Sequence, residues 1–166
     1  MKTILIDHEK CTGCMLCEYA CSIQHSGVFN IDKSRITVHQ NEEKATFVPM
    51  VCESCSNLPC VSSCPEEAIS YDDENSMPKV DREKCIGCGV CVEVCPYDGV
   101  KLDPDNKAII CDLCGGDPEC AKVCSFAEAI QVIDLKNKKE LRRKIQLAVK
   151  RSNVLEILKE NIESDK

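Results

Sequence analysis

The alternation of apolar and polar positions predicts few regular elements, most of them short. Residues 2–7 are apolar and β-prone, and they predict a strand at the start of the chain. Two further apolar runs, Arg35-Ile-Thr-Val-His39 and Ala45-Thr-Phe-Val48, flank the polar residues 40–44 and predict a hairpin. We therefore expect an α+β fold of short strands and short helices.

The C-terminal residues 134–166 have a different pattern and predict a basic, amphipathic helical tail. From Lys136 onward, the apolar residues Leu141, Ile145 and Ala148 fall on one helical face. Asn153, three residues before Glu156, forms a capping pair and predicts that a second helix begins there. Its apolar residues are Leu155, Leu158 and Ile162. An amphipathic face alone does not decide whether the tail packs on the chain or docks a partner subunit.

An internal repeat organises the rest of the chain. The segment Ile6-Asp-His-Glu-Lys-Cys11-Thr-Gly-Cys14 matches Val80-Asp-Arg-Glu-Lys-Cys85-Ile-Gly-Cys88 almost residue for residue. The segment that begins at Val51 is repeated in the same way from Ile110. The predicted organisation is a first half at residues 1–75 with an insertion at 22–49, a second half at 76–133, and the tail at 134–166.

Each half contains two motifs of four cysteines. Motif three, Cys85-Ile-Gly-Cys88-Gly-Val-Cys91-Val-Glu-Val-Cys95-Pro96, has the spacing by which bacterial ferredoxins bind [4Fe–4S] clusters. Its glycines permit a tight loop, because glycine adopts positive φ without steric cost. Motif one has the same spacing, with Ser22 in place of the proline. The ligands of motifs one, two and four are Cys11, Cys14, Cys17, Cys21; Cys52, Cys55, Cys60, Cys64; and Cys111, Cys114, Cys120, Cys124.

The sixteen cysteines in four motifs predict four [4Fe–4S] clusters with no cysteine left over. In ferredoxins, the fourth cysteine of a motif binds the neighbouring cluster. Motifs two and three both end in Cys-Pro, and motifs one and four both end in Cys-Ser, which favours a nested pairing. The ligand sets are then Cys11, Cys14, Cys17 with Cys124; Cys111, Cys114, Cys120 with Cys21; Cys85, Cys88, Cys91 with Cys64; and Cys52, Cys55, Cys60 with Cys95. The alternative pairs motif one with two and motif three with four.

The composition supports metal rather than disulfides. Aromatic residues are 4% of the chain and tryptophan is absent, so clusters would fill an interior poor in large side chains. Dense cysteines also occur in disulfide-rich secreted proteins. However, the start of the chain has no apolar run typical of a signal peptide, and no stretch approaches the length of a membrane span. We therefore expect a reducing, cytoplasmic location and no direct membrane span.

Other chemistries fit the sequence less well. A net charge of −7 disfavours binding to nucleic acid. Structural zinc takes two separated C-x-x-C pairs, which motifs one and three do not supply. The three histidines, His8, His25 and His39, stand at no ligand spacing, so polar or structural roles are expected for them. The sequence contains no credible nucleophile–base pair, and no catalytic residue is predicted.

The cysteine framework, about residues 5–133, resembles the four-cluster, ferredoxin-like electron-transfer subunits of molybdenum and tungsten oxidoreductases. These include the iron–sulfur subunits of the dimethyl-sulfoxide-reductase and formate-dehydrogenase type. More narrowly, the segment from Cys11 to Asn30 and Cys111-Asp-Leu-Cys114-Gly-Gly-Asp-Pro118 are similar to small subunits that accompany aldehyde ferredoxin oxidoreductases. This resemblance implies a duplicated bacterial-ferredoxin-like fold and the nested pairing. The absence of proline after Cys21 and Cys124 departs from the pattern, and the tail lies outside it.

The resemblance also implies a function. The large partner subunit would hold a tungsten or molybdenum pterin and oxidise aldehydes, and this chain would conduct the electrons to ferredoxin or another acceptor. The alternatives are a free-standing polyferredoxin and an iron–sulfur subunit of a formate dehydrogenase, a dimethyl-sulfoxide reductase or a hydrogenase complex. In each case the chain would not be catalytic alone.

Overall fold

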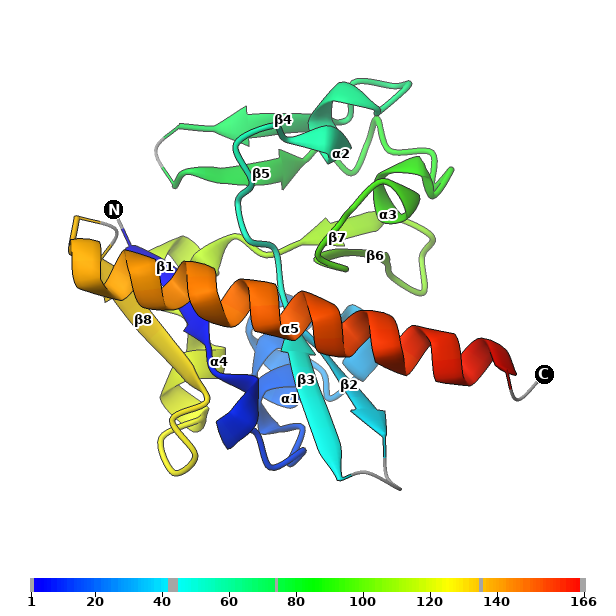
Figure 1. The fold of residues 1–166 in the computed structure, drawn as a ribbon. Coiled ribbons are helices and arrows are strands. Elements are labelled where there is room, and N and C mark those ends of the chain that lie inside the picture. Colours follow the sequence, from blue (N-terminus) through cyan, green and yellow to red (C-terminus); the bar gives the residue numbers. More distant parts are fainter. Residues whose placement is uncertain (1, 42–44, 74, 135, 165–166) are drawn as a thin grey trace.

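The computed structural model describes the backbone of residues 2–41, 45–73, 75–134 and 136–164. Within the last helix, side chains are described up to residue 154, except at 138, 141 and 152. The chain forms two lobes, and the long helix α5 (Lys138–Ser164) runs across the front of the first lobe, near the level where the lobes meet (Figure 1).

The first lobe is built from both ends of the chain. Its strands form two antiparallel pairs, β1 (Lys2–Ile6) with β8 (Ile130–Asp134) and β2 (Thr37–Asn41) with β3 (Thr46–Met50). Helices α1 (Leu16–Ser26) and α4 (Glu119–Val123) pack against each other. Short 3₁₀ turns cover His8–Lys10, Ile31–Lys33 and Leu113–Gly116. The predicted strand and hairpin are confirmed, although residues 40 and 41 belong to β2 and not to the connection.

The second lobe comprises the middle of the chain, about residues 52–110. Two antiparallel pairs face each other here, β4 (Ile69–Asp72) with β5 (Met77–Val80) and β6 (Val100–Leu102) with β7 (Ala108–Ile110). The short helices α2 (Pro59–Ser62) and α3 (Val90–Glu93) complete the lobe. The boundary predicted from the repeat, between residues 75 and 76, falls in the connection of the β4–β5 hairpin. The sequence of the second lobe therefore lies between the two segments that form the first lobe.

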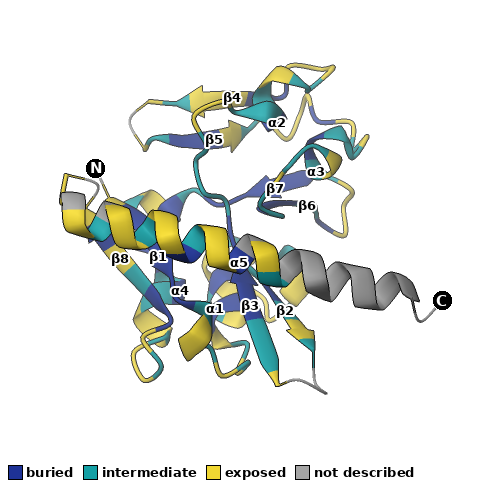
Figure 2. Ribbon diagram, in the orientation of Figure 1, coloured by how far each residue is buried: buried dark blue, intermediate teal, exposed yellow. Residues whose placement is uncertain are grey.

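Buried residues lie in both lobes (Figure 2), and many of them are cysteines. The core of the first lobe combines cysteines of motifs one and four with the aliphatic residues Ile4, Ile6, Ile36, Val38 and Ile130. The core of the second lobe combines cysteines of motifs two and three with Ala68, Ile69, Val100, Ala108 and Ile110. Cys52 packs against both cores. Few large side chains fill these cores, in agreement with the composition.

Helix α5 is continuous, so the predicted start of a second helix at Asn153 is wrong. Arg151 and Val154 lie three residues apart on one helical face. Arg151 is buried and pairs with Glu53, and Val154 packs against Val48 and Met50 of β3. The predicted apolar face is also partly wrong. Ile145 is 56% exposed, whereas Leu147 and Arg151 are buried. The side chain of Leu141 lies outside the described residues. Among the described residues, no helix combines the length and apolar character needed to cross a membrane.

Candidate iron–sulfur sites

The third cysteine of every motif lies at the second position of a helix. These residues are Cys17 in α1, Cys60 in α2, Cys91 in α3 and Cys120 in α4. The first two cysteines of each motif lie in the loop before that helix, and the fourth lies in the helix or just after it. This shared layout places three sulfur atoms of each motif around one point.

The loops turn sharply before the helices. The residue before α1, α2 and α3 has a left-handed backbone, at Met15, Leu58 and Gly89 respectively. Gly13 and Gly87, between the first two cysteines of motifs one and three, also have positive φ. A side chain at Gly87 would meet the carbonyl oxygen of Asn106. Glycine is therefore required at this position both for the backbone conformation and for space.

The structure gathers the sixteen cysteines into four groups. Cys124 lies near Cys11 and Cys17, and Cys21 lies near Cys111, Cys114 and Cys120. In the second lobe, Cys64 lies beside Cys91, and Cys95 lies beside Cys52, Cys55 and Cys60. These are the neighbours that the nested pairing predicts, and not those of the pairing within each half.

The four groups follow one another through the molecule. Cys52 lies near Cys111, so the group that contains Cys52 and the group that contains Cys111 are adjacent. These two are called the inner groups, and the other two are called the outer groups. The outer groups reach the surface, because Cys14 and Cys88 are exposed. One hollow is lined by Cys11, Cys14, Cys17 and Cys124, and another by Cys64, Cys85, Cys88 and Cys91. Across the molecule, the groups therefore follow in this order: the outer and the inner group of the first lobe, then the inner and the outer group of the second lobe.

Backbone N–H groups point at several of the sulfur atoms. The amide of Ala68 donates to Cys64 Sγ at 3.3 Å, and the amide of Gly99 donates to Cys95 Sγ at 3.3 Å. The fourth cysteines of motifs two and three thus accept equivalent bonds from residues four positions on. Further amide donors to sulfur are Arg35 to Cys21, Ala108 to Cys85 and Leu113 to Cys111, at 3.2, 3.4 and 3.4 Å. Such bonds stabilise negative charge on sulfur.

Burial makes these thiols poor acids in the absence of a cation. Burial is the largest cause that raises the pKa of Cys52 and of Cys120, each to about 12, and of Cys91 to about 11. It also raises the pKa values of Cys17 and Cys111 well above their ordinary value. Thiolates are the ligand form, and a coordinated metal supplies the positive charge that removes the proton. Groups of four converging sulfurs, each with at least one buried member, and amide donors to several of them therefore fit iron–sulfur clusters.

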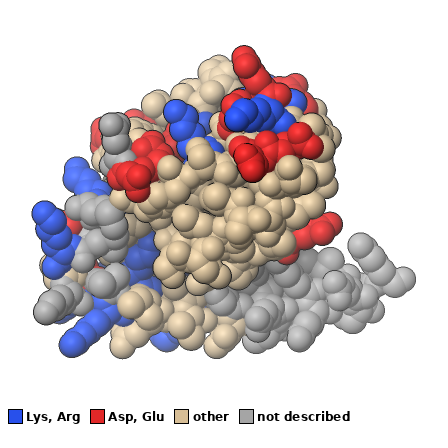
Figure 3. Space-filling view, turned by 90° about the horizontal axis from the view of Figure 1, so that it is seen from above, with Lys and Arg blue, Asp and Glu red and all other residues tan. Residues whose placement is uncertain are grey.

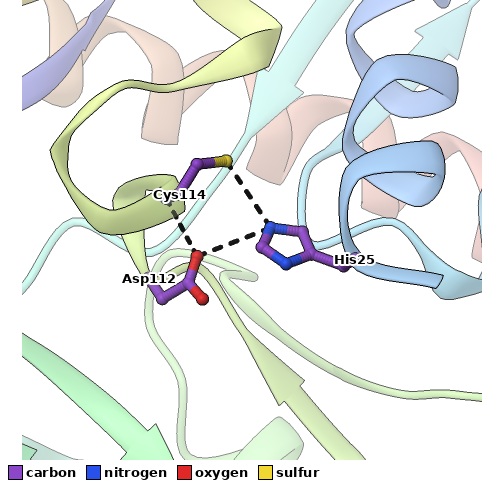
Figure 4. A group of neighbouring side chains, drawn as sticks. All are labelled: His25, Asp112 and Cys114. Atoms are coloured by element: carbon purple, nitrogen blue, oxygen red, sulfur yellow. Dashed lines mark hydrogen bonds and ion pairs between the residues drawn. The ribbon is translucent and has the colours of Figure 1, made fainter. Parts of the chain in front are cut away.

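The sequence did not indicate the role of His25. This residue lies near the end of α1, and its Nε2 atom is 3.6 Å from Cys114 Sγ and 3.5 Å from Asp112 Oδ1 (Figure 4). Asp112 also pairs with Arg35, and its Oδ1 accepts a hydrogen bond from the amide of Cys114 at 3.0 Å. Burial and the charge of Arg35 lower the pKa of His25. The residues are distant in sequence, so no spacing rule could have found the contact.

Comparisons with known families agree with the cysteine motifs. A family model described as a 4Fe-4S dicluster domain matches residues 10–68, and one described as the LdpA Fe-S cluster-binding domain matches residues 52–104. Together these matches span all of motifs one, two and three.

Relatives of similar length are also found. The chain is 41% identical over 134 residues to the polyferredoxin-like subunit of aliphatic sulfonate oxidoreductase from Pyrococcus furiosus, covering 78% of this chain and 76% of that protein. It is 34% identical over 135 residues to the thiosulfate reductase electron transfer subunit PhsB of Salmonella typhi, covering 73% and 70%. A solved structure, the active-site complex BamBC of benzoyl coenzyme A reductase, contains a chain with 26% identity and a TM-score of 0.47, covering 85% and 86%.

Proposed function

This chain belongs to the family of ferredoxin-like, iron–sulfur electron-transfer subunits of oxidoreductases, and on that premise we propose that it holds four [4Fe–4S] clusters and conducts electrons between a catalytic subunit and an external acceptor. When bound, each cluster supplies reversible one-electron transfer with little rearrangement. The chain itself supplies the spacing, the insulation from water and the hydrogen bonds that adjust the potentials.

The observation that carries this proposal is the order of the four cysteine groups. Two groups lie beside each other and contain no exposed cysteine, and the two outer groups each include an exposed cysteine. Electrons entering at one exposed end can therefore cross both lobes and leave at the other. The proposed ligands are the sixteen cysteines in the nested sets given above.

The surface of the first lobe supports a permanent partner. Six large apolar side chains on α1 and the segment after it are exposed, and the first two lie within motif one. Phe29 is 76% exposed, and its ring centroid lies 5.9 Å from that of Tyr19. The six residues, here called the α1 patch, are Leu16, Tyr19, Ile23, Val28, Phe29 and Ile31. Contiguous apolar surface of this kind marks protein interfaces, and obligate interfaces are the most apolar.

The other end of the molecule has a different surface. Figure 3 shows the face over the second lobe, where the described charged side chains gather toward the edges of a broad area without charge. Ile86, between the first two cysteines of motif three, is 60% exposed. An uncharged area of this kind, bordered by charges, suits a transient encounter with ferredoxin or another acceptor. The proposal therefore assigns the catalytic subunit to the α1 patch and the acceptor to the second lobe.

The catalytic subunit is proposed to be one of two kinds of enzyme. The resemblance of motifs one and four implies a tungsten or molybdenum pterin enzyme that oxidises aldehydes. The Pyrococcus furiosus relative is a subunit of an aliphatic sulfonate oxidoreductase, so a sulfonate is the second candidate substrate of the partner. The sixteen cysteines, read as iron ligands, require a reducing compartment, which we propose is the cytoplasm.

Native anaerobic purification of the tagged chain from its own cells tests the proposal. We expect a brown complex with about sixteen irons in this subunit, as four clusters require, and a large partner that contains tungsten or molybdenum. The complex should reduce an artificial acceptor with aldehydes or with aliphatic sulfonates, which distinguishes the two substrate classes.

Two other outcomes contradict parts of the proposal. A brown protein with the full iron content and no partner would make the chain a free-standing polyferredoxin. A colourless protein that holds zinc would reject electron transfer altogether.

A further inference from the structure

We propose that His25 sets the reduction potential of the inner cluster held by Cys21, Cys111, Cys114 and Cys120, by donating a side-chain hydrogen bond to Cys114 Sγ. This inference rests on the proposed function, since it requires that the group holds a cluster. It goes further because it assigns a role to a residue that is not a ligand, and it distinguishes one cluster from the other three.

The contact has a defined donor. His25 Nε2 lies 3.6 Å from Cys114 Sγ and 3.5 Å from Asp112 Oδ1, and its side chain is 14% exposed (Figure 4). A thiolate sulfur and a carboxylate oxygen are both acceptors, so the nitrogen between them must carry a hydrogen. This conclusion holds whether the ring is neutral or charged. The distance of 3.6 Å between His25 Nε2 and Cys114 Sγ is within the range of an N–H···S hydrogen bond.

Asp112 holds the histidine in place. Its Oδ1 accepts from the amide of Cys114 at 3.0 Å, and its Oδ2 pairs with the guanidinium of Arg35. The backbone N–H of Arg35 in turn donates to Cys21 Sγ at 3.2 Å. The same three residues therefore connect two ligands of one group, Cys114 and Cys21. The sulfur hydrogen bonds described above come from backbone N–H groups, which truncation of a side chain leaves in place, whereas truncation of His25 deletes its bond.

The repeated half shows that this feature is specific to one cluster. His25 and Gly99 each stand four residues after the fourth cysteine of their motif, Cys21 and Cys95. A Cβ atom at Gly99 would lie 2.6 Å from the Cα atom of Cys52, so no side chain fits there. The acid that corresponds to Asp112 is Glu53, which pairs with Lys144 and Arg151 of α5. The two inner groups thus share a paired acid, but only the first-lobe group has a histidine at this position.

The expected effect follows from electrostatics. A hydrogen atom near a ligand sulfur stabilises the extra negative charge of the reduced cluster and so raises its potential. Removing the donor should favour the oxidised form. We expect His25→Leu to change the oxidised-to-reduced ratio of this cluster about tenfold at fixed potential, which corresponds to about 59 mV for one electron.

The test is an anaerobic redox titration of the holoprotein followed by electron paramagnetic resonance, together with iron analysis. The variants are His25→Leu, His25→Gln and a control, His39→Leu. His39 is also a partly buried histidine paired with an aspartate, Asp98, and it lies on β2. The inference predicts full iron content in all three variants and a lowered potential of one cluster in His25→Leu. His25→Gln, which keeps an N–H donor, should shift the potential less, and His39→Leu should not shift it.

Two results would overturn the inference. Unchanged potentials in His25→Leu would show that the hydrogen bond has no influence on the cluster. Loss of about four irons per chain, the content of one cubane, would show that His25 is needed to hold the cluster instead. The proposed function fails separately, in the unsubstituted protein, if that protein contains no iron–sulfur cluster.

Discussion

At the scale of single residues, the cluster loops depend on backbone conformations that most side chains disfavour. Gly13 and Gly87 both have positive φ, and a Cβ atom at either would overlap a neighbour. At Gly13 the neighbour is the ring of Phe47, which can move, but at Gly87 it is the backbone oxygen of Asn106. Gly89 has a similar φ with open space around it. The two glycines of motif three therefore differ in what a substitution would cost.

We predict that Gly87→Ala impairs the protein more than Gly89→Ala. Both variants incur the left-handed strain of about 1–2 kcal/mol. Gly87→Ala additionally places its methyl group 2.1 Å from the Asn106 oxygen, so the loop must shift. Thermal unfolding of the holoprotein, followed by its visible absorption, should show the lower midpoint for Gly87→Ala. Equal midpoints would show that the loop adapts without cost.

At the scale of elements, α5 is fastened to both lobes by charged side chains, in addition to its apolar contacts with the first lobe. Arg151 is 1% exposed and pairs with Glu53, and Lys144 reaches the same carboxylate at 2.8 Å. Nearer the start of the helix, Arg143 pairs with Asp7 at 3.1 Å. Glu53 stands directly after the ligand Cys52, so the helix stabilises the loop of motif two. The basic character seen in the sequence thus serves packing within the chain along the described part of α5.

We predict that Glu53→Gln is strongly destabilising. The change leaves the buried Arg151 and the largely buried Lys144 without their carboxylate, and breaking a buried pair in this way costs about 3–5 kcal/mol. For a chain of this size, the thermal midpoint should fall by roughly 10 °C.

The matched control is Glu9→Gln. Glu9 pairs with Lys150 of the same helix at 3.0 Å, but both side chains are more than half exposed. Exposed pairs contribute about 0–1 kcal/mol, so its midpoint should hardly change. A similar decrease in both variants would contradict the assignment of Glu53 as the buried anchor of α5.

At the scale of the whole molecule, the two outer cysteine groups lie near two different surfaces, the α1 patch on the first lobe and the face over the second lobe. We predict that Phe29→Glu, in the α1 patch, weakens binding of the catalytic subunit without changing the iron content. Charging the centre of an apolar interface costs several kcal/mol, or about a hundredfold or more in affinity. Ile145→Glu on α5 is the control, because that side chain is exposed on a different element. Co-purification and titration of the isolated subunits measure both. Unimpaired binding in Phe29→Glu would place the partner elsewhere.

We also predict that removal of iron destroys the compact fold. Both cores include buried cysteines, and the aliphatic residues between them are few. Without metal, each group would leave protonated thiols around a hollow that no side chain fills. Chelation under anaerobic conditions should enlarge the hydrodynamic radius and abolish a cooperative thermal transition. An apoprotein that stays compact would show that the protein scaffold folds without clusters.

The sequence by itself determined the elements that depend on local rules and indicated the candidate cysteine ligands. Cysteine spacing indicated the loops of motifs one and three, because a tight loop can be recognised from neighbours along the chain. Apolar periodicity located β1 and the β2–β3 hairpin for the same reason. The repeat and the Cys-Pro and Cys-Ser ends indicated the nested pairing, whose neighbours the structure brings together.

Only the tertiary structure decided what depends on contacts between distant segments. Helix α5 continues through Asn153 because Arg151 pairs with Glu53 and Val154 packs on β3, and these contacts outweigh the local capping signal. The contact of His25 with Cys114 spans 89 residues, and the pairing of Glu53 with Arg151 spans 98. The free energy of such contacts depends on burial and on the direction of side chains, and neither is encoded by spacing along the chain.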